Sequence, residues 1–363
     1  MSTRCLLFAL LLLQVSSVSA QEVAGGVYGQ SSGDERHLMP QVLVRTPRGT
    51  RAHAEASYLV DVWSRASVIQ TPDAKAWLDS QYHHELSGRL GYDWGELRAG
   101  AHYRYVNRED YVSHTLDIPL VYRLPDQVSI LSVQPYLRLN HITRVRDASF
   151  SQSSQMLGLR AGYQPWLGDR TIGQVAYELQ YAGGYLSSPY YYVGVGARDP
   201  STGCGGAVYC IPETLPGHRI SHALVLLFRR ALTESASAGL RYRLFVDDWA
   251  MMSHTIEPDV AWSVWPGGLL RLRYRAYFQS ATAAFRDAVA LQPGGDIAKY
   301  VASDPRWSSL QSHRVSVDLE HTFGSRVPFT TFLSLGFYRV INGVVSADRS
   351  TALEATLWLL LLF

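Results

Sequence analysis

Apolar and polar residues alternate over segments of about ten residues through most of this 363-residue chain. In LLRLRYRAYFQ, residues 269–279, leucine and aromatic residues alternate with Arg271, Arg273 and Arg275. Successive side chains of a strand point to opposite faces, so these segments predict strands with one apolar and one polar face. Helical periodicity is hard to find after residue 20. The pattern therefore predicts an all-β fold.

The polar faces favour a membrane protein over a soluble sandwich. A soluble sheet exposes a polar face rich in lysine, whereas Lys75 and Lys299 are the only lysines here, and arginines alternate with leucine and aromatic residues. Backbone groups in hydrocarbon must pair within the protein, so strands that cross a membrane have to close into a barrel. We therefore expect a transmembrane antiparallel β-barrel. A formal net charge of +2 without a basic cluster speaks against nucleic acid as a partner.

The connections between the alternating segments differ in length in a regular way. Short turns such as DWGE and WPGG alternate with longer connections, 61–80, 185–216 and 282–309. Short periplasmic turns and long extracellular loops are typical of outer-membrane barrels, and they place both termini of the barrel in the periplasm. The predicted strands are 22–29, 39–46, 51–60, 81–93, 96–107, 111–123, 128–144, 153–165, 171–184, 217–230, 235–247, 252–264, 268–281, 310–323, 327–340 and 349–363. They number sixteen, with fourteen as the alternative because the first segment is weak.

The first twenty residues predict export. Arg4 precedes a short apolar run, and Val18 and Ala20 stand where a signal peptidase cuts. The run is too short to span a bilayer, so we expect a signal peptide at 1–20 and a single barrel domain at 21–363. Only Cys204 and Cys210 then remain, and two nearby cysteines in an exported protein predict a disulfide.

The final segment is apolar on one face and ends at Phe363. A last strand that ends in an aromatic residue resembles the assembly signal of bacterial outer-membrane proteins. The resemblance implies the barrel-assembly machinery as a partner, together with the lipids and lipopolysaccharide of the outer membrane.

Four Ser-His pairs begin four of the predicted strands: Ser113-His114, Ser221-His222, Ser253-His254 and Ser312-His313. Strand geometry puts serine and histidine of one pair on opposite faces, so no pair forms a catalytic dyad. Histidines of different pairs are separated by roughly 10 Å or more, too far for a shared metal. We therefore expect no catalytic residue, no metal and no cofactor, and we interpret His114, His222, His254 and His313 as a ring at the outer membrane interface.

The opposite faces of the strands predict a charged lumen. A column of arginines, 271, 273 and 275, is expected between carboxylates of the two neighbouring strands, which would form favourable cross-strand pairs. The residues predicted to line the lumen are Arg98, Arg104, Arg138, Arg241, Arg243, Arg271, Arg273, Arg275, Glu257, Asp259, Asp318 and Glu320.

Three functions fit such a barrel. A water-filled lumen would make a porin-like passive channel for small solutes, weakly selective for anions. If the loops 185–216 or 282–309 fold inward, the barrel is plugged and serves a structural or surface-binding role. The third possibility is an outer-membrane enzyme that modifies lipids. We favour the channel and expect no enzymatic activity.

Short motifs resemble a known family. SYLVDVWSRASVIQTPDA, residues 57–74, carries a Tyr-Leu-x-Asp-x-x-x-x-Ala-Ser segment, and Ser-His-Thr begins the strands at 113 and 253. Together with RLRYRAYFQSATAAF from Arg271, these segments resemble a family of bacterial outer-membrane barrels without known function. The resemblance implies a barrel in the outer membrane; it implies no substrate and no catalytic residues.

Overall fold

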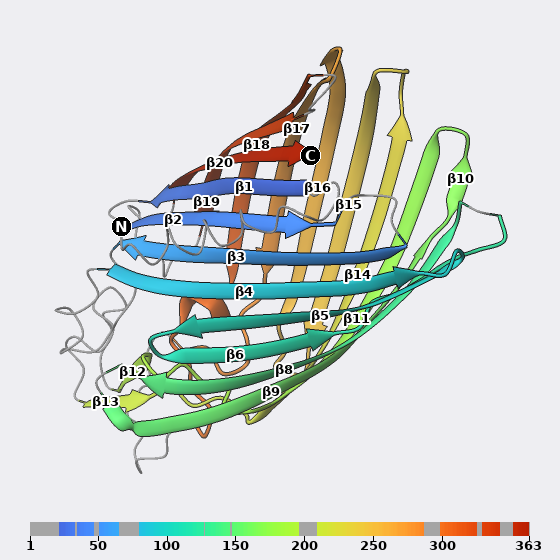
Figure 1. Ribbon diagram of the computed structural model, residues 1–363. Helices are drawn as coiled ribbons and strands as arrows, with labels where there is room; N and C mark the ends of the chain where they lie inside the picture. The colour runs from blue at the N-terminus through green and yellow to red at the C-terminus, as the bar shows by residue number, and fades with distance from the viewer. Residues whose placement is uncertain are drawn as a thin grey trace, which may run out of the picture.

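The strands close into a single antiparallel barrel (Figure 1). The computed structural model describes residues 22–32, 35–46, 51–64, 80–126, 128–145, 147–195, 209–286, 298–324, 329–341 and 351–362. Eighteen strands are hydrogen-bonded in one sheet, and two short ones, β7 and β10, continue the line of β6 and β9, so the wall has sixteen positions. Its strands are β1 (Glu22–Ser32), β2 (Glu35–Arg45), β3 (Ala52–Ser64), β4 (Ser80–Asp93), β5 (Leu97–Arg108), β6 (Tyr111–Asp117), β7 (Leu120–Arg123), β8 (Ile130–Arg144), β9 (Asp147–Gln164), β10 (Trp166–Gly168), β11 (Thr171–Gly184), β14 (His218–Ala231), β15 (Ala236–Asp247), β16 (Met252–Trp265), β17 (Gly268–Gln279), β18 (Leu310–Phe323), β19 (Phe329–Ile341) and β20 (Thr351–Leu362).

The first and last strands close the barrel. β1 pairs with β2 on one side and with β20 on the other, from Glu22 opposite Leu362 to Ser31 opposite Leu353. The prediction of an antiparallel barrel is thus confirmed with sixteen strands, and the alternative of fourteen is wrong. The weak first segment is a full wall strand because its small residues still supply backbone hydrogen bonds to both neighbours.

Prolines mark two irregularities of the wall, one inside a predicted strand and one at the end of another. The segment predicted as 111–123 breaks after Asp117, where Pro119 lacks the N–H that a ladder requires. The carbonyl of Pro119 still accepts a hydrogen bond from Gly100 N at 3.0 Å, so the strand line continues. At the end of β9, Pro165 precedes the short strand β10, whose register is shifted by a bulge.

The two ends of the barrel differ as the sequence predicts. At the end where β20 finishes, the connections are short, and Pro266-Gly267 alone joins β16 to β17, with Gly267 at a φ of 77°. The long connections lie at the other end, on the left in Figure 1. One of them contains a hairpin of β12 (Tyr192–Val195) and β13 (Tyr209–Pro212), and another contains the 3-10 turn η2 (Pro305–Trp307).

The apolar face of the wall points outward. Large apolar residues at every second position are exposed, among them Leu86, Leu116, Val260, Leu272 and Val317. In a water-soluble protein such a surface would be unstable, whereas in a bilayer it contacts acyl chains. No helix in the described ranges is long and apolar enough to span a membrane.

Candidate functional site

The inner face of β15 to β18 carries the densest charge. Glu257 on β16 lies 3.7 Å from Arg241 of β15 and 4.0 Å from Arg273 of β17, measured between nitrogen and oxygen. Arg273 also approaches Asp318 of β18 at 3.2 Å, and Arg271 lies 3.9 Å from Asp259. The structure therefore brings most of the predicted arginine column together with carboxylates on both neighbouring strands.

Three predicted members of this wall stand outside the ion pairs. Arg275, Arg243 and Glu320 have no partner of opposite charge within 4.0 Å among the described residues. The guanidinium of Arg243 lies 5.3 Å from the ring of Phe245 instead. Register places Arg275 opposite Arg314, another arginine, and Glu320 opposite Leu269. The carboxylates of β18 thus do not extend along the whole arginine column.

The remaining predicted lumen residues lie on other parts of the wall. Arg104 is 3.9 Å from Glu85, and Arg138 donates to the hydroxyl of Thr115 at 3.3 Å. Arg98 pairs with Asp93 at 2.8 Å beside the turn that joins β4 to β5. These contacts are local to neighbouring strands.

One ion pair on the wall, which skips a strand, was missed by the sequence analysis. Arg229 of β14 reaches both carboxylate oxygens of Asp259 on β16 at 2.6 Å, crossing the intervening strand at Gly239. A Cβ at Gly239 would lie 2.6 Å from Asp259 Oδ1 and 2.7 Å from the Arg229 guanidinium. The glycine therefore leaves the space through which the ion pair passes.

The same arrangement occurs at two other places. Arg314 of β18 donates to Glu354 of β20 at 2.6 Å across Gly336. The ring of Tyr136 on β8 crosses Gly158 of β9, and its hydroxyl donates to Glu178 of β11 at 2.8 Å. A glycine at an inner position of a strand, with a long polar residue on one neighbour and a carboxylate on the other, is the sequence signal for these bridges.

Each of the four predicted ring histidines is hydrogen-bonded to a tyrosine on the outer face. The tyrosine always lies on the wall strand that precedes and pairs with the strand of the histidine, and a fifth pair, Tyr58 with His84, has the same geometry. The hydroxyl to Nδ1 distances are 2.7 Å for Tyr103 with His114, 2.6 Å for Tyr177 with His222, 2.8 Å for Tyr242 with His254, 2.7 Å for Tyr274 with His313 and 2.8 Å for Tyr58 with His84. The serines that precede four of these histidines are buried on the inner face.

Register shows that these five histidines lie at one height. Through β5, His84 is in register with Val112, and His114 lies two residues further on. From His114 the register runs over four strand steps to His218, and His222 lies four residues further on. The register leads from His222 over two strands to Met252, two residues before His254. It leads in the same way from His254 over two strands to Gln311, two residues before His313. Because the strands of a barrel tilt with a fixed stagger, this uniform displacement describes a level ring.

A second row of aromatic residues lies below this Tyr-His ring. Eight residues after the histidine, four of the strands carry Tyr92, Tyr122, Trp262 and His321 on the outer face. Eight residues span about 26 Å of strand, or about 20 Å along the axis of a barrel tilted by about 40°. The outward residues between the rows are apolar, for example Leu116 on β6, Ile118 between the two strands and Leu120 on β7. The two rows therefore frame an apolar band about 20 Å tall, somewhat less than the roughly 25 Å typical of outer-membrane barrels.

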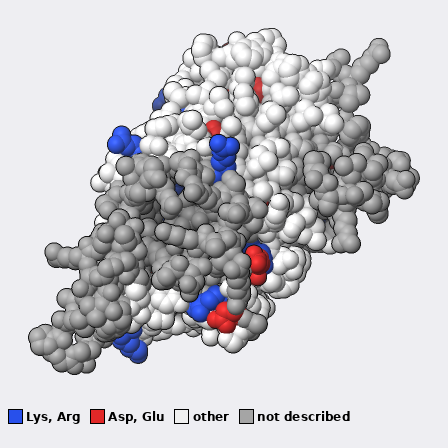
Figure 2. Space-filling model, turned by 90° about the vertical axis from the view of Figure 1, so that its left-hand side faces the viewer, with Lys and Arg blue, Asp and Glu red and all other residues white. Residues whose placement is uncertain are grey.

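The two long connections pack on each other at the outer mouth. Leu215 of one and Ala284 and Ala302 of the other form a small buried cluster with Trp249 from the turn between β15 and β16. A backbone bridge joins Thr214 to Val301. We call the described residues 185–195, 209–217, 280–286 and 298–309 the outer cap. Figure 2 views the barrel from this end, where few charged side chains appear on the described surface.

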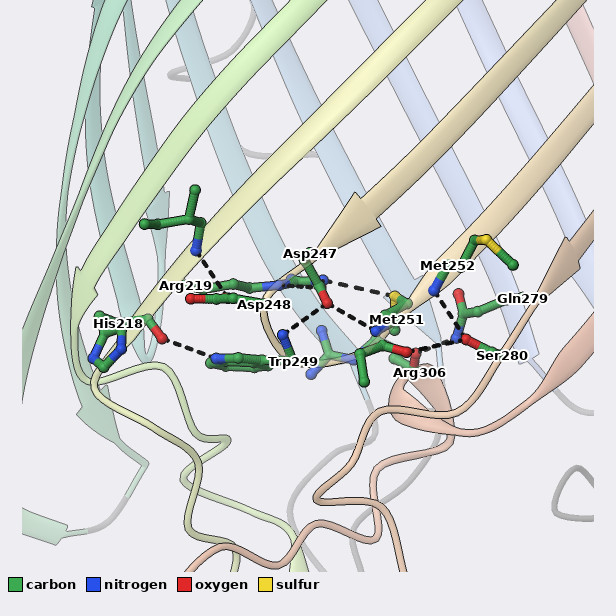
Figure 3. Close-up of polar contacts among 12 residues, drawn as sticks. His218, Arg219, Asp247, Asp248, Trp249, Met251, Met252, Gln279, Ser280 and Arg306 are labelled. Atoms are coloured by element: carbon green, nitrogen blue, oxygen red, sulfur yellow. Dashed lines mark hydrogen bonds and ion pairs between the residues drawn. The ribbon is translucent and has the colours of Figure 1, made fainter.

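An arginine on the inner wall holds the outer cap in place. The guanidinium of Arg219 is ion-paired with the fully buried carboxylate of Asp247 (Figure 3). It also lies 5.4, 5.0 and 5.1 Å from the rings of Phe245, Trp249 and Trp307, the last of which belongs to the outer cap. Arginine stacks well on aromatic faces while its fork binds a carboxylate. Asp247 also accepts hydrogen bonds from the backbone N–H groups of Trp249 and Met251, so its carboxylate is fixed within the turn.

The outer cap also contacts the inner wall directly. Gln279, the last inward residue of β17, donates from Nε2 to the carbonyls of Arg306 and Ser308 at 2.8 Å (Figure 3). Across the mouth, Arg144 donates to the carbonyl of Pro189 at 3.2 Å. The described parts of both predicted plugging loops thus lie against the inner rim of the mouth.

A buried carboxyl joins the two halves of the outer cap. Glu213 accepts from the backbone N–H of Ser188 at 2.9 Å and of Asp304 at 3.4 Å. Burial raises the pKa of Glu213 to about 7; the two backbone donors oppose this rise, and the neighbouring carboxylate of Asp304 adds to it. The side chain therefore changes charge near neutral pH.

Three predictions fall partly or wholly outside the described residues. Cys210 lies on β13, but Cys204 lies outside the described ranges, so the disulfide stays a prediction. The signal peptide 1–20 and Phe363 also lie outside them. Among the described residues, no three His, Cys, Asp or Glu side chains gather as a metal site requires.

Solved structures with a similar fold are outer-membrane barrels. A bacterial polysaccharide outer membrane secretin is 8% identical, with a TM-score of 0.52, and 95% of this chain covers 98% of that one. OprD from Pseudomonas aeruginosa is 9% identical over 95% of both chains, with a TM-score of 0.46. The siderophore receptor PirA from Pseudomonas aeruginosa is 9% identical with a TM-score of 0.44, and the match covers 88% of this chain but only 56% of the receptor.

These likenesses describe the fold alone, and none of the curated proteins matches the chain in sequence. The barrel, its apolar band and its structural neighbours place the protein in the bacterial outer membrane, in contact with membrane lipid. A family model described as "Protein of unknown function (DUF3570)" matches residues 141–339, which is more than half of the chain. The resemblance to an outer-membrane barrel family without known function is confirmed: the chain belongs to this family.

Proposed function

We propose that the protein is a porin-like passive channel for small solutes across the outer membrane. The observation that carries the proposal is the exposure of arginines on separate parts of the inner wall. The side chains of Arg89 on β4, Arg160 on β9 and Arg241 on β15 are 56, 50 and 52% exposed, although each is within 4.0 Å of a carboxylate. A lumen filled by packed protein would bury these groups, whereas water in the lumen keeps them solvated.

In this proposal, the outer cap narrows the channel at its mouth. It lies against the inner rim through Gln279 and Arg144 and is fastened by Arg219. A solute would pass the outer cap first and then the ion pairs of the inner wall. The electric field between their positive and negative groups would orient polar molecules in a wide barrel. The proposed function includes no catalytic step, because serine and histidine of each Ser-His pair lie on opposite faces of the wall.

Conductance of the refolded protein in planar bilayers tests this proposal. We expect discrete steps, and we expect Trp307→Ala, which removes one face of the Arg219 clamp, to give larger or noisier steps because the outer cap loosens. Tyr163→Phe is the matched control, since this outward tyrosine has no hydrogen-bond partner among the described residues and lies far from the mouth. A folded barrel without conductance in either variant would contradict the proposal.

A further inference from the structure

The inner wall of β15, β16 and β17 holds more guanidinium groups than carboxylates. Arg241 and Arg243 on β15 and Arg273 and Arg275 on β17 flank two inward carboxylates of β16, Glu257 and Asp259, and Asp259 is already paired with Arg229 and Arg271. Two of the four arginines, Arg241 and Arg273, approach Glu257, and Arg273 is shared with Asp318. The other two, Arg243 and Arg275, have no carboxylate within 4.0 Å in the part of the chain that the structure describes.

Arg243 and Arg275 stand at the same height. In register, Arg243 lies opposite Thr255, which lies opposite Tyr277. The stagger of one residue per strand, established by the Tyr-His ring, shifts this level by two residues over two strands and leads to Arg275. Their backbones are about 12 Å apart, since they lie two strands apart and are displaced by two residues along the strands. Thr255 between them is small and buried, so the two long side chains face the same part of the lumen.

A like-charged neighbour makes Arg275 unfavourable where it stands. It lies directly opposite Arg314, and like charges opposite each other destabilise a sheet. Arg314 is neutralised by Glu354 at 2.6 Å, but Arg275 is exposed to the lumen and no described residue supplies it with such a partner. An anion bound between Arg243 and Arg275 removes this repulsion, and planar guanidinium forks suit the paired oxygens of a phosphate or carboxylate.

We propose that Arg243 and Arg275 form a binding subsite for oxyanions, phosphate or carboxylate groups of small solutes, on the wall of the lumen. The inference rests on the proposed channel function, since a solute has to reach the lumen to occupy the subsite. Glu257 lies next to the subsite, but its charge is shared by two other arginines.

Calorimetric titration of the detergent-solubilised, folded protein with inorganic phosphate tests the subsite, with acetate and chloride as further titrants. We expect saturable phosphate binding that Arg243→Gln and Arg275→Gln each weaken about five-fold. Arg275→Lys keeps the charge and removes the guanidinium fork, so its phosphate affinity should lie between those of the unmodified protein and Arg275→Gln. The matched control is Arg170→Gln, which loses the same charge in a short exposed turn outside the lumen and should bind like the unmodified protein.

The outcomes separate the subsite from the channel. Binding of acetate in place of phosphate, with the same dependence on both arginines, supports the subsite and assigns it to carboxylates. Equal binding in all variants, or equal binding of chloride, overturns it. Conductance without arginine-dependent binding supports the channel and overturns the subsite. Arginine-dependent binding without conductance supports the subsite and contradicts the channel. Heat-modifiable gel mobility shows that each variant is folded.

Discussion

Replacing Gly158 with alanine tests the bridge in which Tyr136 crosses β9. A Cβ at this position would lie 2.1 Å from Cζ and 2.3 Å from Cε1 of the Tyr136 ring. Because real Cβ atoms do not approach that closely, the ring has to leave its place. Its hydroxyl then loses the hydrogen bonds to Glu178 at 2.8 Å and Gln180 at 3.2 Å, and Arg160 loses the ring that lies 4.6 Å from its guanidinium.

The expected loss of stability follows from these contacts. A hydrogen bond to a charged acceptor contributes about 1.5–3 kcal/mol, and overpacking costs about 1–3 kcal/mol. The lower backbone entropy of alanine in the unfolded chain offsets about 0.4–1 kcal/mol. We therefore expect Gly158→Ala to lower the free energy of unfolding by about 2–4 kcal/mol.

Gly25→Ala is the matched control, because a Cβ at Gly25 meets nothing within 4 Å. It should stabilise the barrel by about 0.4–1 kcal/mol. The assay is urea unfolding in thin-bilayer vesicles, followed by tryptophan fluorescence and by gel mobility. If Gly158→Ala is as stable as Gly25→Ala, the ring of Tyr136 does not occupy the space above Gly158 and the reasoning about inner glycines fails.

Three further predictions concern the ring and the outer cap. Tyr274→Phe removes a 2.7 Å hydrogen bond to His313 and should lower the free energy of unfolding by about 1 kcal/mol, with Tyr163→Phe unchanged; equal values for both would contradict a role of the Tyr-His pair in stability. Arg219→Gln should speed amide exchange in residues 298–309 while β1 to β4 keep their protection; unchanged exchange would show that the outer cap is held elsewhere. The pKa of Glu213 is about 7 in the folded protein and about 4.5 in the unfolded chain, so Glu213 binds its proton more tightly when the outer cap is closed. The closed outer cap should therefore be most stable below pH 4.5 and lose this stability as the pH rises toward 7. Glu213→Gln should abolish the pH dependence, measured as amide exchange at Ser188 and Asp304 corrected for intrinsic rates.

The fold could be predicted from sequence because alternation and loop length act on every strand. A shift of one residue would turn the whole apolar face of a strand inward, so the alternation in segments such as 268–281 determines which residues face lipid and which face the lumen. The ends and interruptions of strands were harder to predict from the sequence. Pro119 interrupts the hydrogen-bond ladder without ending the strand line, and β1 pairs with β20, which lies more than three hundred residues further along the chain.

The site was predicted less completely, for a physical reason. Adjacent strands could be paired from the predicted order, which brings Glu257, Arg273 and Asp318 together. Contacts that skip a strand depend on an inner glycine at the right height, so Arg229 with Asp259 could not be seen without the register. The tyrosine partners were missed for a similar reason: Tyr274 and His313 are separated by a connection of thirty residues, and only their common stagger aligns them.

The height of the Tyr-His ring shows at which depth of the membrane Arg275 lies. The ring marks the outer boundary of the apolar band, and Arg275 stands about two residues below the ring, at the depth of acyl chains. A cation without a carboxylate is strongly unfavourable in hydrocarbon and is tolerated there only when it faces water or a counter-ion. Arg275 points away from lipid, has no carboxylate within 4.0 Å among the described residues and is exposed. In the proposed channel, water or a mobile anion in the lumen would stabilise Arg275, and this links the proposed channel to the proposed oxyanion subsite.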